Sequence, residues 1–315
     1  MSKLKILVTG GAGFIGSNLI ARLLSIGHEV YSLDNYFTGS IDNEHDGCTY
    51  IEGDVQKISE IFDEKFDVIF HLAALARIQP SFRNPVEVFD ANATGTHMVL
   101  EYARRTGAKV VFAGSSSRWH DPTQSPYAMS KYLGEQLCQM YVSSYKMNVH
   151  IARFYNVYGP GEIMGGDYAT LIGIWRNKRE RGEPLPIYGD GEQRRDFTHV
   201  FDICDGLCRI METNSDTREW ELGTGVNYSI NQICDMFGTE RVYLPDKPHN
   251  YRETIRKNDV ALLELGWTPE DRLRGYLRGS ATPRTPPAPR ENDRGEAVLN
   301  ASDTGAVLDE RCQVS

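Results

Sequence analysis

Short apolar runs alternate with longer amphipathic stretches in the first half of the chain. Residues 4–9 and 29–33 are apolar runs of strand length, and residues 14–26 carry apolar side chains at helical spacing. A glycine-rich turn at residues 10–16 separates the first run from the helix. Strand, turn, helix and strand thus follow one another within about thirty residues, which is the length of one βαβ unit.

The same alternation continues through the first half of the chain. Residues 68–72, 110–113 and 150–154 are further strand-like runs, while residues 85–106 and 126–146 carry helix-length apolar patterns. Strands that alternate with helices favour a parallel sheet with helices on both faces. The chain is therefore predicted to be an α/β protein with a Rossmann-like, doubly wound parallel sheet.

The pattern becomes irregular after residue 154, where glycine and proline are frequent. Such a segment suits a smaller C-terminal α/β lobe that closes over the carboxyl ends of the strands, where ligands bind in these folds. We predict a Rossmann domain over residues 1–155 with a return segment near 196–222, and the smaller lobe over residues 156–195 and 223–279.

The last 36 residues, 280–315, differ in composition from the rest of the chain. They contain no aromatic residue and four prolines, and four arginines face six acidic residues. Too little apolar area is available there to offset the entropy of ordering the chain. We predict a disordered tail or a non-native extension, with an interaction tail as the alternative.

Composition excludes several classes of protein. Apolar residues make up 40% of the 315 residues and charged residues 24%, which is ordinary for a globular protein. The formal charge of −9 disfavours a nucleic-acid binder, which needs a basic face. No stretch approaches the 18 apolar residues of a membrane span. The six cysteines are scattered without metal-ligand spacing, so we predict reduced thiols, no metal site and a cytoplasmic protein.

The glycine turn carries the first chemical signal. Residues 11–16 fit G-x-G-x-x-G, and Gly10, Gly13 and Gly16 fit the spaced G-x-x-G-x-x-G variant. Glycine lets the backbone turn tightly and approach a pyrophosphate, and the following helix offers free N–H groups. Because the motif follows a strand and opens a helix, it predicts a dinucleotide site, with an ordinary turn as the alternative.

Asp34, at the end of the next strand, indicates which dinucleotide binds. Its carboxylate can accept hydrogen bonds from both hydroxyls of an adenosine ribose, and it would repel a 2′-phosphate. No arginine follows, since the next residues are Asn35, Tyr36 and Phe37. NAD is therefore favoured over NADP, although a strand-end cap is the plainer interpretation of Asp34.

Tyr127 and Lys131 stand four residues apart and so share one helical face. An ammonium beside a phenol lowers its pKa, and such a phenol can exchange a proton with a substrate hydroxyl. Upstream, three serines at 115–117 follow the apolar run 110–113. Ser115 would then lie at a carboxyl strand end and share the reacting oxygen with Tyr127. The plainer alternatives are a surface pair and a polar turn.

With these residues assembled, the chain resembles the extended short-chain dehydrogenases/reductases over roughly residues 4–277. More closely, it resembles the NAD-dependent nucleotide-sugar epimerase/dehydratase family, and within it the UDP-glucose and UDP-N-acetylglucosamine 4-epimerases. Besides the motifs above, the landmarks are residues 53–55, 71–74, 153–160 and 189–197. The resemblance implies that the first domain binds NAD and the smaller lobe binds the nucleotide sugar.

The resemblance also implies roles for individual residues. Catalysis would fall to Ser115, Tyr127 and Lys131. NAD would contact a larger set, namely Gly10, Gly13, Phe14, Ile15, Gly16, Asp34, Asn35, Asp54, Val55, Leu72, Ala73, Ala74, Asn92, Tyr127 and Lys131. The nucleotide sugar would contact Ser115, Ser116, Ser117, Asn156, Leu185, Pro186, Tyr188, Arg195, Arg252 and Glu253.

The residues after the strand that carries Ser115 separate the reactions of this family. Sugar 4,6-dehydratases place Asp-Glu after a threonine there, and related decarboxylases also carry a glutamate. This chain has three serines and no carboxylate. We therefore expect a UDP-sugar 4-epimerase, in which tightly bound NAD oxidises C4 with Tyr127 as base and hydride returns to the opposite face. The alternatives are another epimerase or a dehydratase of the family, or a non-catalytic binder of NAD or nucleotide sugar.

One departure supports the non-catalytic alternative. Trp119 and His120 stand where the family usually has Tyr-Gly, and only seven residues separate Trp119 from Tyr127. That connection is shorter than in the family, where it covers part of the active site. The resemblance further implies a homodimer in which the helices near 85–106 and 126–146 pair across a two-fold axis.

Overall fold

The structure, a computed structural model, describes residues 2–248 and 250–279. Its centre is a seven-stranded sheet in which every paired strand is parallel to its neighbour. This confirms the predicted Rossmann-like fold. In spatial order the strands are β11 (Glu219–Leu222), β6 (Val149–Phe154), β5 (Lys109–Ser115), β4 (Val68–His71), β1 (Lys5–Thr9), β2 (Glu29–Asp34) and β3 (Cys48–Glu52).

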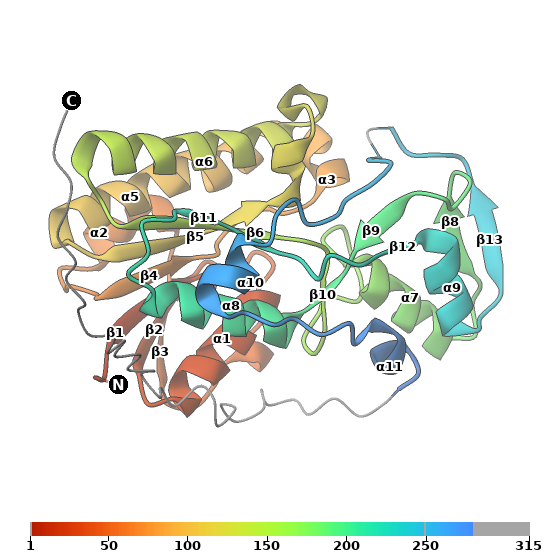
Figure 1. Ribbon diagram of the computed structural model, residues 1–315, viewed down its shortest axis with the longest axis horizontal. Coiled ribbons are helices and arrows are strands. Elements are labelled where there is room, and N and C mark those ends of the chain that lie inside the picture. Colours follow the sequence, from red (N-terminus) through yellow and green to blue (C-terminus); the bar gives the residue numbers. More distant parts are fainter. Residues whose placement is uncertain (1, 249, 280–315) are drawn as a thin grey trace, which may run out of the picture.

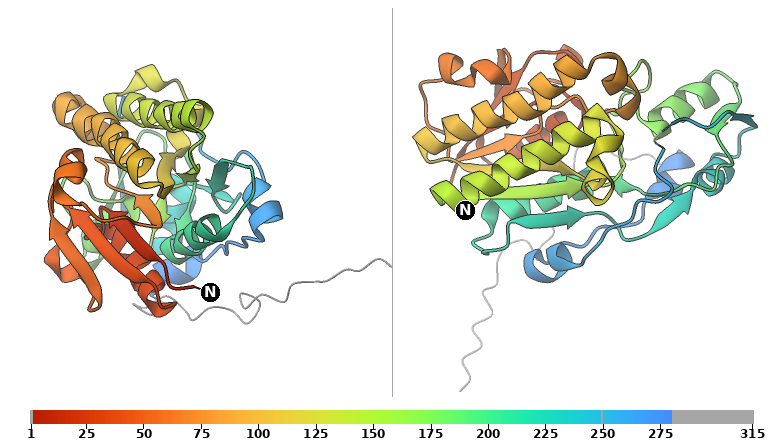
Figure 2. Two further views of the ribbon diagram at one scale, coloured as in Figure 1. Left: turned by 90° about the vertical axis from the view of Figure 1, so that its left-hand side faces the viewer. Right: turned by 90° about the horizontal axis from the view of Figure 1, so that it is seen from above.

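Helices cover both faces of this sheet (Figure 1 and Figure 2, left). On one face lie α1 (Phe14–Ser25), α8 (Val200–Glu212) and α10 (Val260–Leu265), and on the other α2 (Ile58–Ile61), α5 (Gly95–Thr106) and α6 (Pro126–Tyr145). Seen from above, α5 and α6 run side by side (Figure 2, right). Because the sheet is covered twice, its inner strands are apolar almost throughout.

The helix expected over residues 85–106 is interrupted. It consists of α4 (Pro85–Phe89), a π-helical turn over Asp90–Thr94, and α5. A Cβ on Gly95 would come within 2.8 Å of Val55 Cγ2, so glycine allows α5 to pack closely against the loop after β3. A hydrophobic period alone does not reveal such a local widening, which often marks a functional segment.

A second lobe extends the molecule on the right of Figure 1. Its core is aromatic and aliphatic, with Trp175, Ile233 and Phe237 buried together. The lobe consists of three two-stranded pairs and three helices: β7 (Val157–Tyr158) with β10 (Thr198–His199), β8 (Leu185–Tyr188) with β13 (Arg241–Leu244), β9 (Arg194–Asp196) with β12 (Asn227–Ser229), and α7 (Leu171–Glu180), α9 (Ile230–Phe237) and α11 (Leu273–Leu277).

The chain crosses between the two parts more than once. After β10 it enters α8, which packs against α1, and β11 then joins the edge of the main sheet beside β6. The domain boundaries given above stay a prediction, and residues 280–315 lie outside the described residues.

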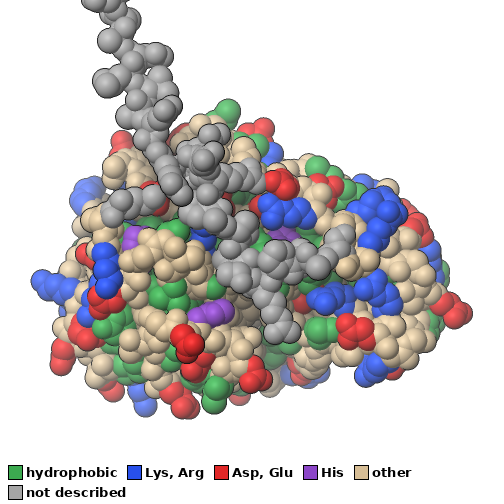
Figure 3. All heavy atoms as spheres, turned by 90° about the horizontal axis from the view of Figure 1, so that it is seen from below, with side chains coloured by type: hydrophobic (Ala, Val, Ile, Leu, Met, Phe, Trp, Pro, Cys, Tyr) green, Lys and Arg blue, Asp and Glu red, His purple; other side chains and the backbone are tan. Residues whose placement is uncertain are grey.

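On the face seen in Figure 3, basic side chains occur beside acidic ones.

Candidate active site

A cleft of about 770 Å³ lies between the carboxyl ends of the parallel strands and the second lobe. From the sheet side it is lined by residues that follow β1, β2, β4, β5 and β6. From the other side it is lined by residues of α7, β8 and β9 and of the segment after β13. In open α/β sheets this edge is where ligands bind.

Most of the predicted site residues line this one cleft. Four of them, Asn92, Leu185, Arg252 and Glu253, are not among its lining residues. The residues that do line it are Gly10, Gly13, Phe14, Ile15, Gly16, Asp34, Asn35, Asp54, Val55, Leu72, Ala73, Ala74, Ser115, Ser116, Ser117, Tyr127, Lys131, Asn156, Pro186, Tyr188 and Arg195.

The glycine turn leaves no room for a side chain at Gly10 or Gly16, and at Gly13 it faces the cleft. Gly10 has φ +73°, and a Cβ on it would come within 2.8 Å of the Ala73 nitrogen. A Cβ on Gly16 would come within 2.1 Å of the Gly10 carbonyl oxygen. A Cβ on Gly13 would meet only that oxygen, at 3.2 Å, and would otherwise occupy the cleft that Gly13 lines. The turn is thus an open cradle at the start of α1, which suits a pyrophosphate.

Asp34 lies at the end of β2 on the wall of the same cleft. Its carboxylate accepts hydrogen bonds from the backbone N–H groups of Ala12 (2.9 Å) and Tyr36 (2.8 Å). Burial raises the pKa of Asp34, and these hydrogen bonds counter that effect in part. A glycine cradle and a carboxylate one strand apart fit the pyrophosphate and the ribose of NAD.

Asn92 differs from the other predicted cofactor contacts, because it does not line the cleft. Its side chain is buried and fully engaged: Oδ1 accepts from the Leu75 N–H (2.8 Å), and Nδ2 donates to the Leu75 carbonyl (3.1 Å) and to Ser130 Oγ (2.9 Å). The π-helical turn directs this amide at the loop after β4. Asn92 therefore holds a cleft-lining loop in position and does not itself line the cleft.

Ser115, Ser117 and Tyr127 form one hydrogen-bonded group. Tyr127, in the first turn of α6, donates from its hydroxyl to Ser115 Oγ at 3.2 Å. Ser117 donates from its hydroxyl (2.9 Å) and its backbone N–H (3.2 Å) to the same oxygen. Ser115 is the last residue of β5, so the strand end fixes this oxygen in the cleft.

Burial and two neighbouring groups act on the pKa of Tyr127. Burial raises this pKa, and the hydrogen bond with Ser115 and the charge of Arg77 lower it only in part. Lys131 is buried, with Nζ 4.3 Å from the centroid of the Phe112 ring. Burial lowers the pKa of Lys131 to about 8, against the charge of Glu135, which raises it. The charge of Arg77 thus opposes the effect of burial on the pKa of Tyr127, and the predicted effect of Lys131 on the same group stays a prediction.

Arg77 is a cleft residue that the sequence analysis missed. Its Nε donates to the Ala169 carbonyl at 3.1 Å, and its Nη1 donates to the Ala76 carbonyl at 2.8 Å. Burial lowers the pKa of the guanidinium. The signal was present, because Arg77 is the one charged residue in the otherwise apolar stretch 72–78.

Asn156 and Arg195 lie at the junction of the sheet and the second lobe. Asn156 Nδ2 donates to the Asp196 carbonyl (2.8 Å) and to Thr254 Oγ1 (3.1 Å). Arg195 donates to the Arg194 carbonyl (2.8 Å) and to Asn250 Oδ1 (2.7 Å). Burial lowers the pKa of Arg195 to about 10.

The other predicted contacts that do not line the cleft belong to the second lobe. Side chains alternate along β8, so Pro186 and Tyr188 line the cleft whereas Leu185 is buried in the core of the lobe. Arg252 is exposed and forms an ion pair with Asp190 at 3.0 Å. Glu253 accepts from Asn227 Nδ2 at 2.7 Å. Thr254, which the sequence analysis did not name, lines the cleft.

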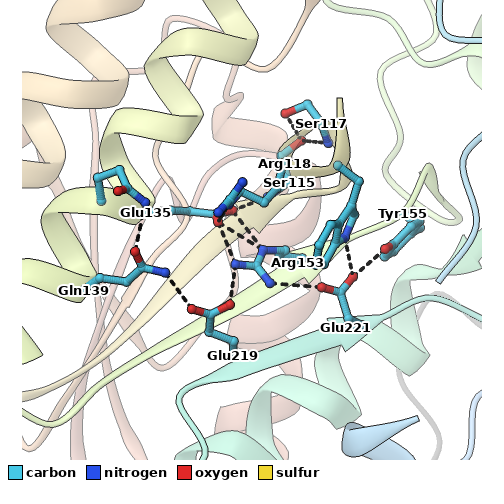
Figure 4. Close-up of polar contacts among 11 residues, drawn as sticks. Ser115, Ser117, Arg118, Glu135, Gln139, Arg153, Tyr155, Glu219 and Glu221 are labelled. Carbon is cyan, nitrogen blue, oxygen red and sulfur yellow. Dashed lines mark hydrogen bonds and ion pairs between the residues drawn. The ribbon is translucent and has the colours of Figure 1, made fainter. Parts of the chain in front are cut away.

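A charge cluster lies behind the serines (Figure 4); Glu135, Arg153 and Glu221 are buried, and Glu219 lies at its exposed edge. At its centre, Arg153 of β6 donates to Glu135 (2.8 Å), Glu219 (2.7 Å) and Glu221 (3.0 Å). Glu135 also accepts the Ser115 backbone N–H at 3.3 Å, which links the cluster to the site. Burial lowers the pKa of Arg153, but the hydrogen bonds and charge of the carboxylates outweigh it and hold that pKa above its ordinary value.

The short connection before Tyr127 is held through two neighbouring side chains, those of Trp119 and His120. Trp119 Nε1 donates to Glu221 Oε2 at 3.2 Å, and the guanidinium of Arg153 lies 5.4 Å from the indole ring centroid. The His120 ring stacks on Tyr251 of the segment after β13, with centroids 3.8 Å apart and planes 5° apart. The connection therefore joins the charge cluster to the far wall of the cleft.

Within residues 2–248 and 250–279, no helix is long and apolar enough to cross a membrane. Over the same residues, no group of histidine, cysteine, aspartate and glutamate side chains is arranged to hold a metal ion.

Comparison with known proteins now identifies the family. The model of the NAD dependent epimerase/dehydratase family matches residues 6–223. A relative from Methanocaldococcus jannaschii, named "Putative UDP-glucose 4-epimerase", is 33% identical, with 87% of this chain and 96% of the relative covered. UDP-glucuronic acid decarboxylase 1 of Xenopus tropicalis is 32% identical, with 84% and 68% covered.

A solved structure agrees in fold with this assignment. The crystal structure of a UDP-glucose 4-epimerase with UDP-glucose from Thermotoga maritima superposes with a TM-score of 0.81 at 29% identity, covering 87% of this chain and 96% of that one. These matches, together with the glycine cradle and Asp34, show that the chain belongs to the NAD-dependent epimerase/dehydratase family of enzymes, whose cofactor is NAD.

Proposed function

We propose that the chain is a UDP-sugar 4-epimerase. The observation that carries the proposal is the group of Ser115, Tyr127 and Lys131 in one cleft with Arg195 and Tyr188. The first three suit proton exchange with a sugar hydroxyl, and the last two suit a diphosphate and a base. Relatives with epimerase names support the reaction class.

In this proposal Tyr127 removes the proton from the C4 hydroxyl of the bound sugar. Ser115 holds the same oxygen, since its hydroxyl already lies 3.2 Å from that of Tyr127. Arg77 favours the phenolate and Lys131 adds a buried positive charge on the same helical face. NAD, when bound, supplies the acceptor and donor of the hydride. Rotation of the keto-sugar between the two transfers gives the 4-epimer.

The residues beside Ser115 favour epimerisation over decarboxylation or dehydration. Ser116 and Ser117 line the cleft at the positions that follow Ser115 in the chain, and they carry no carboxylate. The nearest buried carboxylate behind them, that of Glu135, is engaged by Arg153 and does not line the cleft. The names of several relatives nevertheless make decarboxylation the second candidate.

NMR of UDP-glucose, UDP-N-acetylglucosamine and UDP-glucuronate, each incubated with purified protein without added NAD, tests the proposal. Appearance of a 4-epimer would establish the reaction and show that NAD is retained. Release of carbon dioxide from UDP-glucuronate with formation of a UDP-pentose would replace the proposal by a decarboxylase. A 4-keto-6-deoxy product would indicate a dehydratase. Binding without any product, also after addition of NAD, would indicate a non-catalytic protein.

We also propose a homodimer. Exposed apolar side chains gather on the helical layer formed by α4 and α6: Val86 is 72% exposed, Tyr145 51%, Met140 39% and Leu133 37%. Covering such side chains would favour association. Light scattering at micromolar concentration should report twice the chain mass, and Leu133→Glu should reduce it. A monomeric native protein would contradict the dimer.

A cytoplasmic location completes the proposal. The cysteines within the described residues, Cys48, Cys138, Cys204, Cys208 and Cys234, are free thiols. Thiols without disulfide partners are typical of a reducing compartment. Recovery of the protein in the cytosolic fraction of its host, with these thiols reduced, would test this.

A further inference from the structure

Tyr251 carries a polar group that no described residue satisfies. Its hydroxyl oxygen is buried and has no hydrogen-bond partner among the described residues, although the residue lines the cleft. A buried hydroxyl without a partner costs free energy, so such groups are normally paired. Tyr158 has a similar unpartnered hydroxyl, but it belongs to the core of the second lobe. Tyr168 lines the cleft and has an unpartnered hydroxyl as well, but its ring packs edge-on against Phe37, which follows β2 on the predicted NAD side. Of these three hydroxyls, that of Tyr251 is the one that a ligand outside the NAD site could partner.

The neighbours of this hydroxyl indicate which part of a ligand it would meet. Burial raises the pKa of Tyr251 to about 12, and the charges of Tyr127 and Arg195 act on it in opposite directions. Geometry agrees: Asn250, the residue before Tyr251, accepts a hydrogen bond from Arg195 at 2.7 Å, and Tyr127 and Tyr251 line the same cleft. A sugar that joins a diphosphate to a reacting C4 would lie between Arg195 and Tyr127.

The ring of Tyr251 is held by the short connection before α6. His120 stacks on it with centroids 3.8 Å apart and planes 5° apart. Trp119, the residue before His120, is tied to Glu221 of the charge cluster. Through His120 the connection thus contacts an aromatic residue of the opposite wall. The orientation of the phenol is therefore set before a ligand arrives.

Resting on the function proposed above, we propose that Tyr251 is a substrate-binding residue whose hydroxyl forms a hydrogen bond with the hexosyl unit of the nucleoside diphosphate sugar. His120 is its positioning residue. In this proposal Tyr251, a residue of the second lobe, encloses the side of the sugar that the short connection before Tyr127 leaves open.

Titration calorimetry of the protein as purified, with UDP and with UDP-N-acetylglucosamine or UDP-glucose, tests this inference. UDP contains the base and diphosphate but no hexose. Tyr251→Phe keeps the stacked ring and removes the hydroxyl, so it should weaken UDP-sugar binding by about three- to tenfold and leave UDP binding unchanged. His120→Ala should weaken UDP-sugar binding as well, because the phenol is no longer held. Tyr145→Phe, at the exposed end of α6, is the matched control and should change neither.

The outcomes separate this inference from the proposed function. Equal affinities of Tyr251→Phe and the native protein for the UDP-sugar would overturn the inference even if epimerisation is observed. An equal loss for UDP and UDP-sugar would also overturn it, because the contact would then lie on the nucleotide. A native protein that binds UDP-sugar with the expected dependence on Tyr251 but forms no 4-epimer would overturn the proposed function alone. Native protein that binds no UDP-sugar would overturn both.

Discussion

The two walls of the cleft differ in how far backbone atoms and side chains contribute to them. On the sheet side, the part of the wall predicted to meet the NAD pyrophosphate is backbone: a glycine turn with no room for a side chain at Gly10 or Gly16. The neighbouring loop after β4 is held by the buried amide of Asn92. On the other side, long side chains such as those of Tyr188, Arg195 and Tyr251 reach in from short two-stranded pairs and loops. A backbone wall accepts one shape, whereas a wall of side chains can be altered residue by residue. We therefore expect cofactor identity to be fixed by the first wall and sugar identity by the second.

The largest effect should come from the proposed base. Tyr127→Phe removes the hydroxyl that would take the proton, and loss of such proton transfer costs about 10²- to 10⁴-fold in kcat. NAD content should stay unchanged, because the ring keeps its place at the start of α6. The measurement is turnover of the UDP-sugar beside the NAD absorbance of the same preparation, with Tyr145→Phe as control. Undiminished turnover would refute the assignment of the base.

The second-largest effect should come from the charge cluster around Arg153, which supports the sheet wall. Arg153→Met leaves Glu221 buried without a cation and Glu135 with only Arg118, at 3.6 Å, and loss of a buried partner typically costs about 3–5 kcal/mol of unfolding free energy. Urea unfolding followed by circular dichroism measures this loss. Arg104→Met, which removes one partner of an exposed ion pair, should cost less than about 1 kcal/mol. Similar losses for both variants would mean that burial of the cluster does not matter.

The glycine cradle should respond to a single methyl group. Gly16→Ala would bring a Cβ within 2.1 Å of the Gly10 carbonyl oxygen, so the turn must shift, at a cost of about 1–3 kcal/mol. We expect a lower melting temperature and loss of copurified NAD. Gly165→Ala is the matched control, since its Cβ would find only Asn177 Nδ2, at 3.9 Å. Retention of NAD by Gly16→Ala would show that the sheet wall is less rigid than described.

The smallest effect should come from the second wall. Arg195→Lys keeps the charge but cannot form the planar fork that suits a diphosphate, so KM for the UDP-sugar should rise about tenfold with NAD content unchanged. Arg252→Lys, on the exposed side of the same lobe, should leave KM unchanged. If Arg195→Lys instead reduced NAD content, the hypothesis that the sheet wall binds the cofactor and the second wall binds the UDP-sugar would be contradicted.

The sheet wall was largely predictable from the sequence because its determinants are contiguous. The strand of residues 5–9, the glycine turn and α1 lie within one βαβ unit, and Tyr127 and Lys131 share one helix. The second wall is assembled from β8, β9 and the segment after β13, which are far apart in the chain. Alternation along β8 could have separated Leu185 from Pro186, but no local pattern pairs Arg195 with Asn250.

Contacts across the sheet were the least predictable part. The sequence shows two carboxylates on either side of an apolar residue, at Glu219 and Glu221. It does not show that both carboxylates contact Arg153, which lies on another strand. The same holds for the contact of His120 with Tyr251, which joins segments 131 positions apart. The π-helical turn also escaped prediction, because widening by one residue leaves the apolar pattern of residues 85–106 almost unchanged.

The position of β11 also bears on how the protein is made. A ribosome releases residues 1–155 well before Glu219 and Glu221, so the nascent chain can form β5 and β6 while the outer edge of β6 has no neighbour. An unpaired edge is where a growing chain is open to association with other chains. Arg153, meanwhile, has only one of the carboxylates that later surround it. Completion of the catalytic half thus waits until translation has passed residue 222, and nascent chains stalled before that point should be the ones that need chaperones.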